Sequence, residues 1–227
     1  MLHIHTKLIM KKTIKIDYVS DIACPWCAVG LGSLEQAIKI LDGAADVEIH
    51  FQPFELNPDM PPGGQEVIEH LTQKYGMPEE QIRINQANIR DRAAAVGFPF
   101  HPEGRKHVYN TFDAHRLIHW AGAEYDADAQ YRMKKELLGT YFTLAVNLDD
   151  QNNMIDAVKR AGLDPVRAQE ILSSDTFTEA VRAQQAKYAS MGITSVPSLI
   201  FNDKYLLQGA QPPEAFARAL LQLAEQE

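Results

Sequence analysis

The chemistry of this chain is expected to centre on Cys24 and Cys27, the only cysteines among its 227 residues. They enclose Pro25 and Trp26, and their spacing lets the two sulfurs close into a small, strained disulfide ring. A thiol at a helix N-terminus is more acidic than usual, because the helix dipole and free backbone N–H groups stabilise its anion. The sequence therefore predicts a redox-active pair rather than two buried structural cysteines.

The order of the two cysteines predicts their roles. Cys24 is expected to be the exposed nucleophile, whose thiolate attacks a disulfide sulfur and forms a mixed disulfide. Cys27, one turn further into the helix, then resolves that intermediate. Alternatively, the oxidised pair accepts a substrate thiolate and passes the disulfide on. Pro25 and Trp26 are expected to tune the redox potential and to contact substrate, although Trp26 is equally suited to cover the pair.

Zinc is the competing interpretation of the cysteine pair. His115 and His119 are four residues apart on a predicted helix, so they share a face and with the cysteines offer a Cys₂His₂ ligand set. They also share the stripe of Val108 and Phe112, where histidines are more often packed core residues with satisfied hydrogen bonds. We therefore predict no metal site.

Composition limits the partners. The hydrophobic fraction of 45% and the charged fraction of 23% are those of an ordinary globular protein, long enough for one large domain or two small ones. The net charge of −8 argues against nucleic acid and against an anionic membrane surface. No apolar run approaches the roughly 18 residues that span a bilayer. We expect neither nucleic acid nor membrane as a partner.

The N-terminal residues show no secretory signal, which would need about 7–15 consecutive apolar residues and a small-residue cleavage site. Met10-Lys11-Lys12 looks like a second start, which would make residues 1–9 an extension of little consequence. The predicted location is the cytoplasm. In a reducing compartment, a Cys-x-x-Cys pair is typical of catalysis or metal binding rather than of a structural disulfide.

The cysteines must be positioned by the elements around them. Residues 13–19 alternate in polarity like a half-buried strand, and residues 47–51 do the same. Between them, Pro25 suits the first turn of a helix whose apolar stripe runs to Leu41. The economical interpretation is a parallel β-α-β unit with the cysteines at its first strand-to-helix junction.

The rest of the chain reads as helices followed by a hairpin. A Pro/Gly-rich loop over 53–64 precedes segments with helical patterns at 65–75, 79–96, 104–122, 128–146, 151–161, 165–173 and 176–190. Strands over 197–201 and 204–208, joined by a two-residue turn, form an antiparallel hairpin, and a helix follows from Pro212 to about residue 224. The two strand-bearing ends are expected to share one sheet, with the helical block inserted between them.

Three motifs carry a family resemblance over about residues 12–225. Cys24-Pro25-Trp26-Cys27, the helical insertion, and Thr194-Ser195-Val196-Pro197-Ser198 before a hairpin resemble the DsbA-like branch of the thioredoxin superfamily. The chain is also similar to the FrnE-like subgroup, which is related to kappa-class glutathione transferases and 2-hydroxychromene-2-carboxylate isomerases. The residues that carry this narrower resemblance are Ser20-Asp21-Ile22-Ala23 before the pair, Pro53-Phe54-Glu55-Leu56-Asn57-Pro58 and Gln208-Gly209-Ala210-Gln211.

The resemblance implies an α/β, thioredoxin-like fold with a large all-helical insertion between its βαβ and ββα halves. The thioredoxin-like domain would comprise residues 12–60 and 187–227, and the insertion residues 61–186. Pro197 would follow Val196 through a cis peptide bond, on a loop that faces the cysteine pair and helps to bind extended substrate. Pro197 thus joins the two cysteines as an expected catalytic-site residue, and Val196 as a substrate contact.

The resemblance also leaves open questions near the pair. Relatives place a buried acid about six residues before the first cysteine, where this chain has Tyr18. Asp17 and Asp21 are the nearest acids, and Asp21 is equally suited to a turn or to capping the helix. Strongly oxidising relatives carry a histidine where this chain has Trp26, so a less oxidising disulfide is expected. Phe54 and Asn57 are candidate substrate contacts, with loop packing as the alternative.

The expected function is a thiol–disulfide oxidoreductase or isomerase acting on protein or small thiol substrates. It needs no bound cofactor, and glutathione or a thioredoxin-type reductant would serve as its redox partner. The alternative is a glutathione-dependent transferase or isomerase acting on a small molecule. Such relatives typically carry a serine in place of Cys24 and lack a resolving thiol, so Cys27 favours the oxidoreductase. A redox-sensing binding module without turnover is the third candidate.

Overall fold

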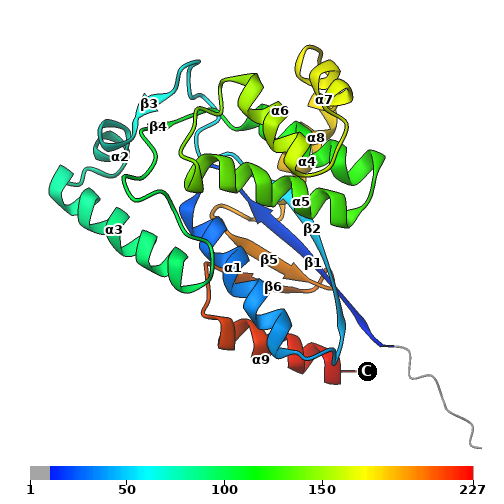
Figure 1. Cartoon of the computed structure of the whole chain (residues 1–227). Helices are drawn as coiled ribbons and strands as arrows, with labels where there is room; N and C mark the ends of the chain where they lie inside the picture. Colours follow the sequence, from blue (N-terminus) through cyan, green and yellow to red (C-terminus); the bar gives the residue numbers. More distant parts are fainter. Residues whose placement is uncertain (1–10, 227) are drawn as a thin grey trace, which may run out of the picture.

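A four-stranded mixed sheet joins the two ends of the chain in the computed structural model, which describes residues 11–226 (Figure 1). Its order is β2-β1-β5-β6, with β1 parallel to β2 and antiparallel to β5. The strands are β1 (Thr13–Ser20), β2 (Asp46–Pro53), β5 (Ser198–Phe201) and β6 (Tyr205–Gln208). The shared sheet confirms the predicted joining of the halves. The N-terminal segment in which we predict no secretory signal lies largely outside the described residues.

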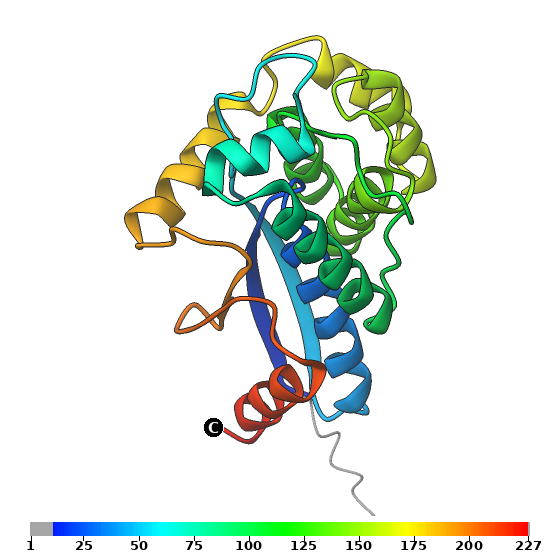
Figure 2. The same cartoon turned by 90° about the vertical axis from the view of Figure 1, so that its left-hand side faces the viewer.

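The central strand β1 is buried on both faces, as its neighbours require. Ile14, Ile16 and Tyr18 belong to the main core together with residues of α1 (Pro25–Ile40) and α9 (Pro213–Glu225). Val19, on the opposite face, belongs to a second cluster with Tyr188 of α8 (Thr178–Ser190). Figure 2, which views the sheet nearly edge-on, shows α1 and α8 on opposite sides of it. This alternation directs Tyr18 toward the start of α1.

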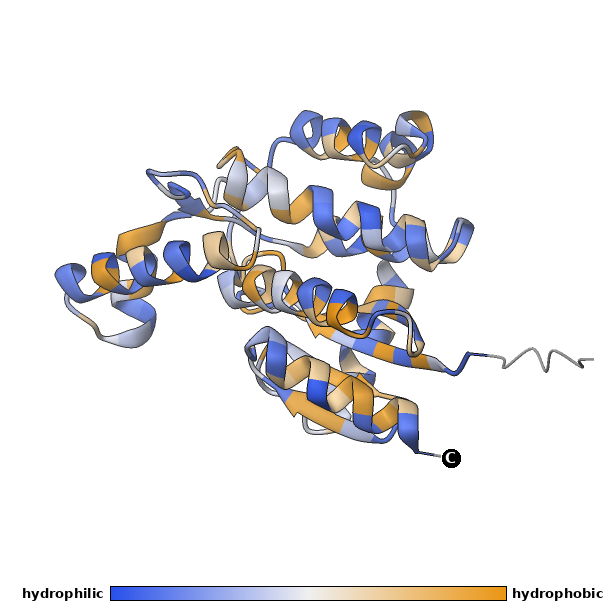
Figure 3. Cartoon of the chain, turned by 60° about the horizontal axis from the view of Figure 1, so that its bottom comes forward, coloured by the Kyte–Doolittle hydropathy of each residue, from blue (hydrophilic) through white to orange (hydrophobic). Residues whose placement is uncertain are grey.

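The residues between β2 and β5 form the helical insertion, with α2 and α3 on one side of the molecule and the other helices grouped above the sheet (Figure 1). Hydrophobic and hydrophilic residues alternate along most of these helices (Figure 3). Before α8 the helices are α2 (Val67–Tyr75), α3 (Glu79–Ala95), α4 (Phe112–Glu124), α5 (Ala127–Leu138), α6 (Gln151–Arg160) and α7 (Pro165–Leu172).

The insertion is not all-helical, which corrects the prediction. β3 (Gln65–Glu66) pairs antiparallel with β4 (His107–Val108). The helix predicted over 104–122 therefore starts only at Phe112, because Gly104 has a φ of +71° and the chain then enters β4. The segment predicted as one helix over 128–146 ends its α-helical part at Leu138 and continues as a π-helical turn, η1 (Gly139–Thr143).

The C-terminal hairpin also has a longer turn than predicted. Phe201 pairs with Tyr205, so three residues rather than two connect the strands. Asn202 and Asp203 have φ values of +50° and +57°. These two residue types tolerate the left-handed region better than most, which explains how a non-glycine turn is made here.

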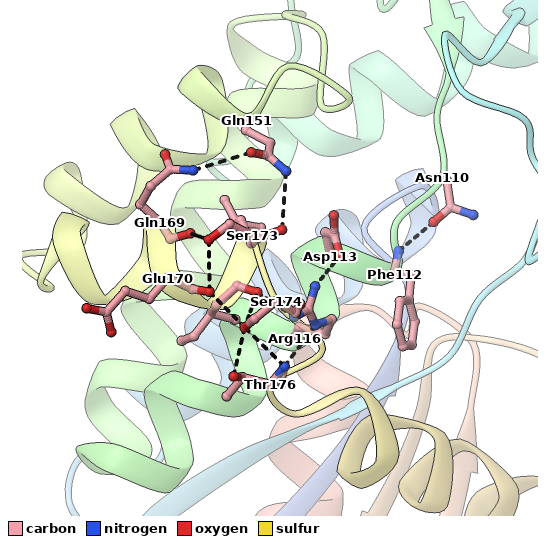
Figure 4. Close-up of polar contacts among 12 residues, drawn as sticks. Asn110, Phe112, Asp113, Arg116, Gln151, Gln169, Glu170, Ser173, Ser174 and Thr176 are labelled. Atoms are coloured by element: carbon pink, nitrogen blue, oxygen red, sulfur yellow. Dashed lines mark hydrogen bonds and ion pairs between the residues drawn. The ribbon is translucent and has the colours of Figure 1, made fainter.

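The corner between α4, α7 and α8 is fixed by Arg116, a buried residue of α4 (Figure 4). Its guanidinium donates to the backbone carbonyls of Ile171, Ser174 and Thr176. Nη1 also donates to the Asp113 carboxylate at 2.7 Å. Arg116 thus contacts carbonyls at the end of α7 and in the turn that follows it.

Among the described residues, no helix combines the length and the apolar character needed to cross a membrane.

Candidate active site

Cys24 lies at the N-terminus of α1, as predicted. β1 ends at Ser20, and a short turn leads to Cys24, whose φ of −89° and ψ of 111° are extended. Pro25 opens the helix, where its missing N–H removes no hydrogen bond. The N–H of Cys27 donates to the carbonyl of Cys24 at 3.1 Å. The local sequence therefore presents the first thiol to the positive end of the helix dipole.

The two thiols differ in access. Cys24 is 4% exposed and lines a cavity, whereas Cys27 is fully buried beneath it. Neither is in a disulfide. Cys24 was expected to be exposed at the surface, and the structure corrects this, since a substrate reaches it only through the cavity. The Sγ atom of Cys24 lies 3.7 Å from the Val196 carbonyl oxygen.

The surroundings also separate the acidities of the thiols. A hydrogen bond from the Cys27 thiol lowers the pKa of Cys24 below its usual value, although burial acts in the opposite direction. Burial raises the pKa of Cys27 well above the usual range, and the neighbouring Cys24 adds to this. A thiolate therefore forms first on Cys24, the thiol that faces the cavity.

The loop opposite the pair has the predicted backbone. The Val196–Pro197 peptide bond is cis, and Val196 lines the cavity beside Cys24. Gly30 of α1 lies against this loop. A Cβ atom on Gly30 would stand 2.6 Å from the Tyr18 hydroxyl oxygen and 3.3 Å from Cγ of Pro197. The absence of a side chain at residue 30 therefore lets α1, β1 and the proline loop meet.

Tyr18 occupies the place where an acid was expected. Its hydroxyl donates to the Cys27 carbonyl at 2.9 Å, and the side chain is fully buried. Burial raises the pKa of Tyr18 well above its usual value, so the phenol keeps its proton. Tyr18 supports the backbone beneath the pair and is not a proton acceptor.

The two candidate acids lie in different places. Asp17 accepts hydrogen bonds from Gln52 at 2.6 Å and contacts Lys15 at 3.0 Å, on the other face of β1 from Tyr18. Asp21 is the acid near Cys24 and is fully buried. It does not cap α1, whose first turn has no side-chain cap. Only Asp21 of the two is therefore close to the thiols.

Asp21 is held by donors from three segments. Its Oδ1 accepts from the Ala23 N–H at 3.2 Å and from the Thr111 hydroxyl at 2.7 Å, and its Oδ2 accepts from the Leu56 N–H at 2.7 Å. Nε2 of His115 lies 3.4 Å from Oδ1. Burial alone would raise the pKa of Asp21, but the contacts with His115, Leu56 and Thr111 lower it below its usual value. The residue is a carboxylate that ties the catalytic turn to the insertion.

Lys134 of α5 is a site residue that the sequence reasoning missed. It is 1% exposed, and burial lowers its pKa to about 8, while the charges of Cys27 and Asp21 act in the opposite direction. Its cation in turn favours the Cys27 thiolate. Its burial could have been predicted from its position four residues after Gln130 and three before Leu137, because this spacing places it on the buried stripe of a helix.

The histidines do not complete a zinc site with the cysteines. His115 contacts Asp21, and Nδ1 of His119 lies 3.3 Å from Oε1 of Gln184. The His119 ring also packs at 5.2 Å from that of Phe177. Within residues 11–226, no three His, Cys, Asp or Glu side chains are grouped so that they could hold a metal ion.

The cavity beside Cys24 has a volume of about 400 Å³ and lies between the start of α1, the 194–196 loop and the α2–α3 arm of the insertion. Pro25, Trp26 and Asn57, three of the predicted substrate contacts, line it. The Oδ1 atom of Asn57 accepts from Nζ of Lys74 at 2.7 Å. Phe54 does not line the cavity and packs against the second core cluster, so the structure favours its loop-packing alternative.

Comparison with known proteins identifies the family. The model of a DsbA-like thioredoxin domain matches residues 15–221. The chain belongs to this family. A probable DsbA oxidoreductase from Streptomyces coelicolor is 32% identical over 94% of this chain and 92% of that one, with a TM-score of 0.84. The uncharacterised protein YwbO of Bacillus subtilis is 28% identical over 210 residues, which are 92% of this chain and 96% of that protein.

A more distant neighbour of this DsbA-like protein shows the fold alone. The cytosolic disulfide reductase DsbM of Pseudomonas aeruginosa, solved with GSH, is 16% identical, with 93% of this chain and 98% of that one covered and a TM-score of 0.60. These matches confirm the predicted α/β thioredoxin-like fold and DsbA-like membership. They support a thiol oxidoreductase in general terms.

Proposed function

We propose that this DsbA-like protein is a thiol–disulfide oxidoreductase or isomerase whose working group is the Cys24–Cys27 dithiol. One observation carries the proposal: the thiol of lowered pKa lines the cavity, and the thiol of raised pKa is buried directly beneath it. That asymmetry matches a nucleophile that meets substrate and a resolving group that does not.

In the reducing direction the exchange balances without another reagent. The Cys24 thiolate attacks one sulfur of a substrate disulfide, so that a Cys24–substrate disulfide forms and the first substrate thiolate leaves. The Cys27 thiol then loses its proton, which a departing substrate thiolate takes up, and attacks the Cys24 sulfur. The Cys24–Cys27 disulfide forms, and the second substrate thiolate leaves. The protein loses two electrons and the substrate gains them, and the oxidising direction reverses these steps.

Loss of the Cys27 proton is the difficult step, because burial strongly favours the neutral thiol. Lys134 is the buried cation that favours its thiolate. We infer that Lys134 is a positioning residue, which stabilises the developing charge on Cys27 without contacting substrate. Asp21 is already ionised and held by several donors, so its role is to orient the turn.

Substrate, partner and compartment are part of the proposal. The substrates are protein or small-molecule thiols and disulfides, with glutathione or a thioredoxin-type reductant recycling the pair and no bound cofactor. We also propose membership of the FrnE-like subgroup and a cytoplasmic location. The description of the DsbM neighbour as a cytosolic disulfide reductase, solved with GSH, is compatible with this.

Insulin reduction with glutathione or dithiothreitol as reductant tests the proposal. Wild type should catalyse it, and Cys24→Ser should be inactive. Cys27→Ser should lose turnover and accumulate a mixed disulfide on Cys24, visible by intact-protein mass spectrometry. A redox potential measured against glutathione should be less oxidising than that of histidine-containing DsbA proteins. A Cys27→Ser protein with undiminished turnover would contradict the dithiol mechanism.

The 400 Å³ cavity supports a second candidate, a glutathione-dependent transferase or isomerase acting on a small molecule. That function uses one thiol at most. Retention of activity by Cys27→Ser, together with an absolute requirement for glutathione, would favour it over the dithiol exchange.

A further inference from the structure

Apart from the Cys24 thiolate, the charged groups that line the cavity are all positive. Its ionisable wall residues beyond the cysteine include Lys74 of α2, Arg90 of α3 and Arg105, which precedes β4, and no aspartate or glutamate lines it. The whole chain has 30 acidic and 22 basic residues. The cavity therefore reverses the net charge of the protein locally, at the place where substrate must enter.

None of these cations forms an ion pair with a carboxylate among the described residues, although the charges of Asp21 and Cys24 act on Lys74. Lys74 donates to neutral oxygens, the Leu56 carbonyl at 2.9 Å and Oδ1 of Asn57 at 2.7 Å. Other arginines do form ion pairs with carboxylates: Arg83, Arg116, Arg132, Arg160, Arg167 and Arg182. Arg90 and Arg105, like Arg92 and Arg218, belong to no ion pair within residues 11–226, and what distinguishes Arg90 and Arg105 is their place in the cavity wall.

Arg105 shows this most clearly. The carbon of its guanidinium lies 5.2 Å from the ring centroid of Tyr141 and 5.1 Å from that of Phe142, so two aromatic rings hold the group in place. Its Nε atom is buried, and no acceptor for it is found in the described part of the chain. A buried donor on a charged group is costly when it has no partner. An anion in the cavity would compensate a charge that the fold leaves unpaired.

The other cations converge on the same wall. An Nη atom of Arg90 lies 3.9 Å from the place where a Cβ on Gly104 would stand, which brings it close to the residue that precedes Arg105. Burial lowers the pKa of His70, a further wall residue, and the charges of Lys74 and Arg105 lower it more. Side chains from three separate segments thus create one positive region.

We propose that this cavity binds a small molecule with an apolar body and an anionic head group such as a carboxylate, with its sulfur presented to Cys24. The rest of the wall is mainly apolar and includes Leu71, Ile82, Ile89 and Phe100. An extended peptide would leave its own N–H and C=O groups unpaired against such a surface. The inference rests on the proposed function and narrows its substrate to low-molecular-weight acidic thiols and their disulfides.

Calorimetric titration of the reduced protein with 4-phenylbutyrate and with the neutral 4-phenylbutanamide tests the site without any turnover. The acid should bind about tenfold more tightly than the amide, which corresponds to a difference of about 1.4 kcal/mol in binding free energy. Arg105→Gln and Arg90→Gln should each weaken binding of the acid by about tenfold and leave binding of the amide unchanged. Arg218→Gln, which removes an exposed arginine of α9 remote from the cavity, should leave both unchanged.

Equal binding of acid and amide would overturn the proposal, as would a Kd for the acid above about 10 mM. Equal weakening by Arg218→Gln would overturn it too, because it would show a non-specific charge effect. Unchanged binding of the amide certifies that each variant is folded. A protein that prefers the acid but reduces neither insulin nor glutathione disulfide keeps the site and loses the proposed function. A protein that reduces insulin but binds acid and amide equally keeps the proposed function, and only the proposed substrate class is overturned.

Discussion

Two regions of the molecule bury a positive charge in opposite ways. At the α4–α7 corner, Arg116 is surrounded by backbone carbonyls and the Asp113 carboxylate (Figure 4). Beneath the cysteines, Lys134 is buried at least as deeply, yet burial lowers its pKa to about 8, and its Nζ atom lies over the Phe51 ring at 5.8 Å without a hydrogen bond to any described residue. The comparison teaches that a well-solvated buried cation stabilises the fold, whereas a poorly solvated one is destabilising and available for chemistry.

The largest effect on stability is expected for Arg116, the buried cation with many hydrogen-bond acceptors. Arg116→Leu removes the donors that satisfy the carbonyls of Ile171, Ser174 and Thr176 and should lower the free energy of unfolding by about 4 kcal/mol. Urea denaturation measures this, with Arg218→Leu as a control expected to change stability by less than about 0.5 kcal/mol. Insulin reduction by the folded variant should be unchanged. A loss of activity without a loss of stability would break the comparison.

Lys134→Met should change stability in the opposite direction and make the protein more stable. Replacing a poorly solvated ammonium by an apolar side chain of similar length should raise the free energy of unfolding at pH 7 by about 3 kcal/mol. Loss of the cation should also raise the pKa of the cysteine thiols, measured by the pH dependence of iodoacetamide labelling, and slow the resolving step.

The pH dependence of that stability difference checks its cause. The folded pKa of Lys134, about 8, lies below the unfolded value of 10.5. Between these values the unfolded chain binds more protons, so the contribution of Lys134 to stability rises with pH. The advantage of the Met variant should therefore be largest below pH 8 and fade toward pH 10.5. An advantage that is independent of pH would show that packing, not charge, produces it.

Arg105→Gln should give the smallest stability effect. Removing Arg105 loses its contacts with the Tyr141 and Phe142 rings but also removes a buried Nε atom that has no acceptor among the described residues, and we expect these opposite effects to leave the free energy of unfolding within about 0.5 kcal/mol. Measured beside Arg116→Leu in the same denaturant series, it separates an arginine held for the fold from one held for a ligand. A destabilisation similar to that of Arg116→Leu would remove this distinction.

What the sequence predicted was local. The alternation in β1, the proline at the start of α1 and the spacing of the cysteines lie within short segments, and they place Cys24 at its junction. The cis bond before Pro197 was predicted through the family resemblance, because an X-Pro pair alone indicates only an extended residue.

The sequence did not predict the site residues that come together only because distant segments of the chain pack against one another. Lys134 lies more than a hundred residues from the cysteines in sequence, and only packing of α5 on β2 brings it beneath them. Arg90 and Arg105 look like ordinary surface residues in a helix and a loop. The helix predicted over 104–122 failed because its apolar spacing did not reveal β4, whose partner strand is β3.

Gly30 makes the catalytic region unusually sensitive to a change that alters no polar group. An added methyl would press on the Tyr18 hydroxyl, which donates to the Cys27 carbonyl, and on the ring of Pro197, which follows the Val196 carbonyl beside Cys24. Both displacements would affect residues that contact the cysteines. A substitution of Gly30 by alanine would therefore be expected to affect catalysis although it changes no cysteine, no charged residue and no residue of the cavity wall.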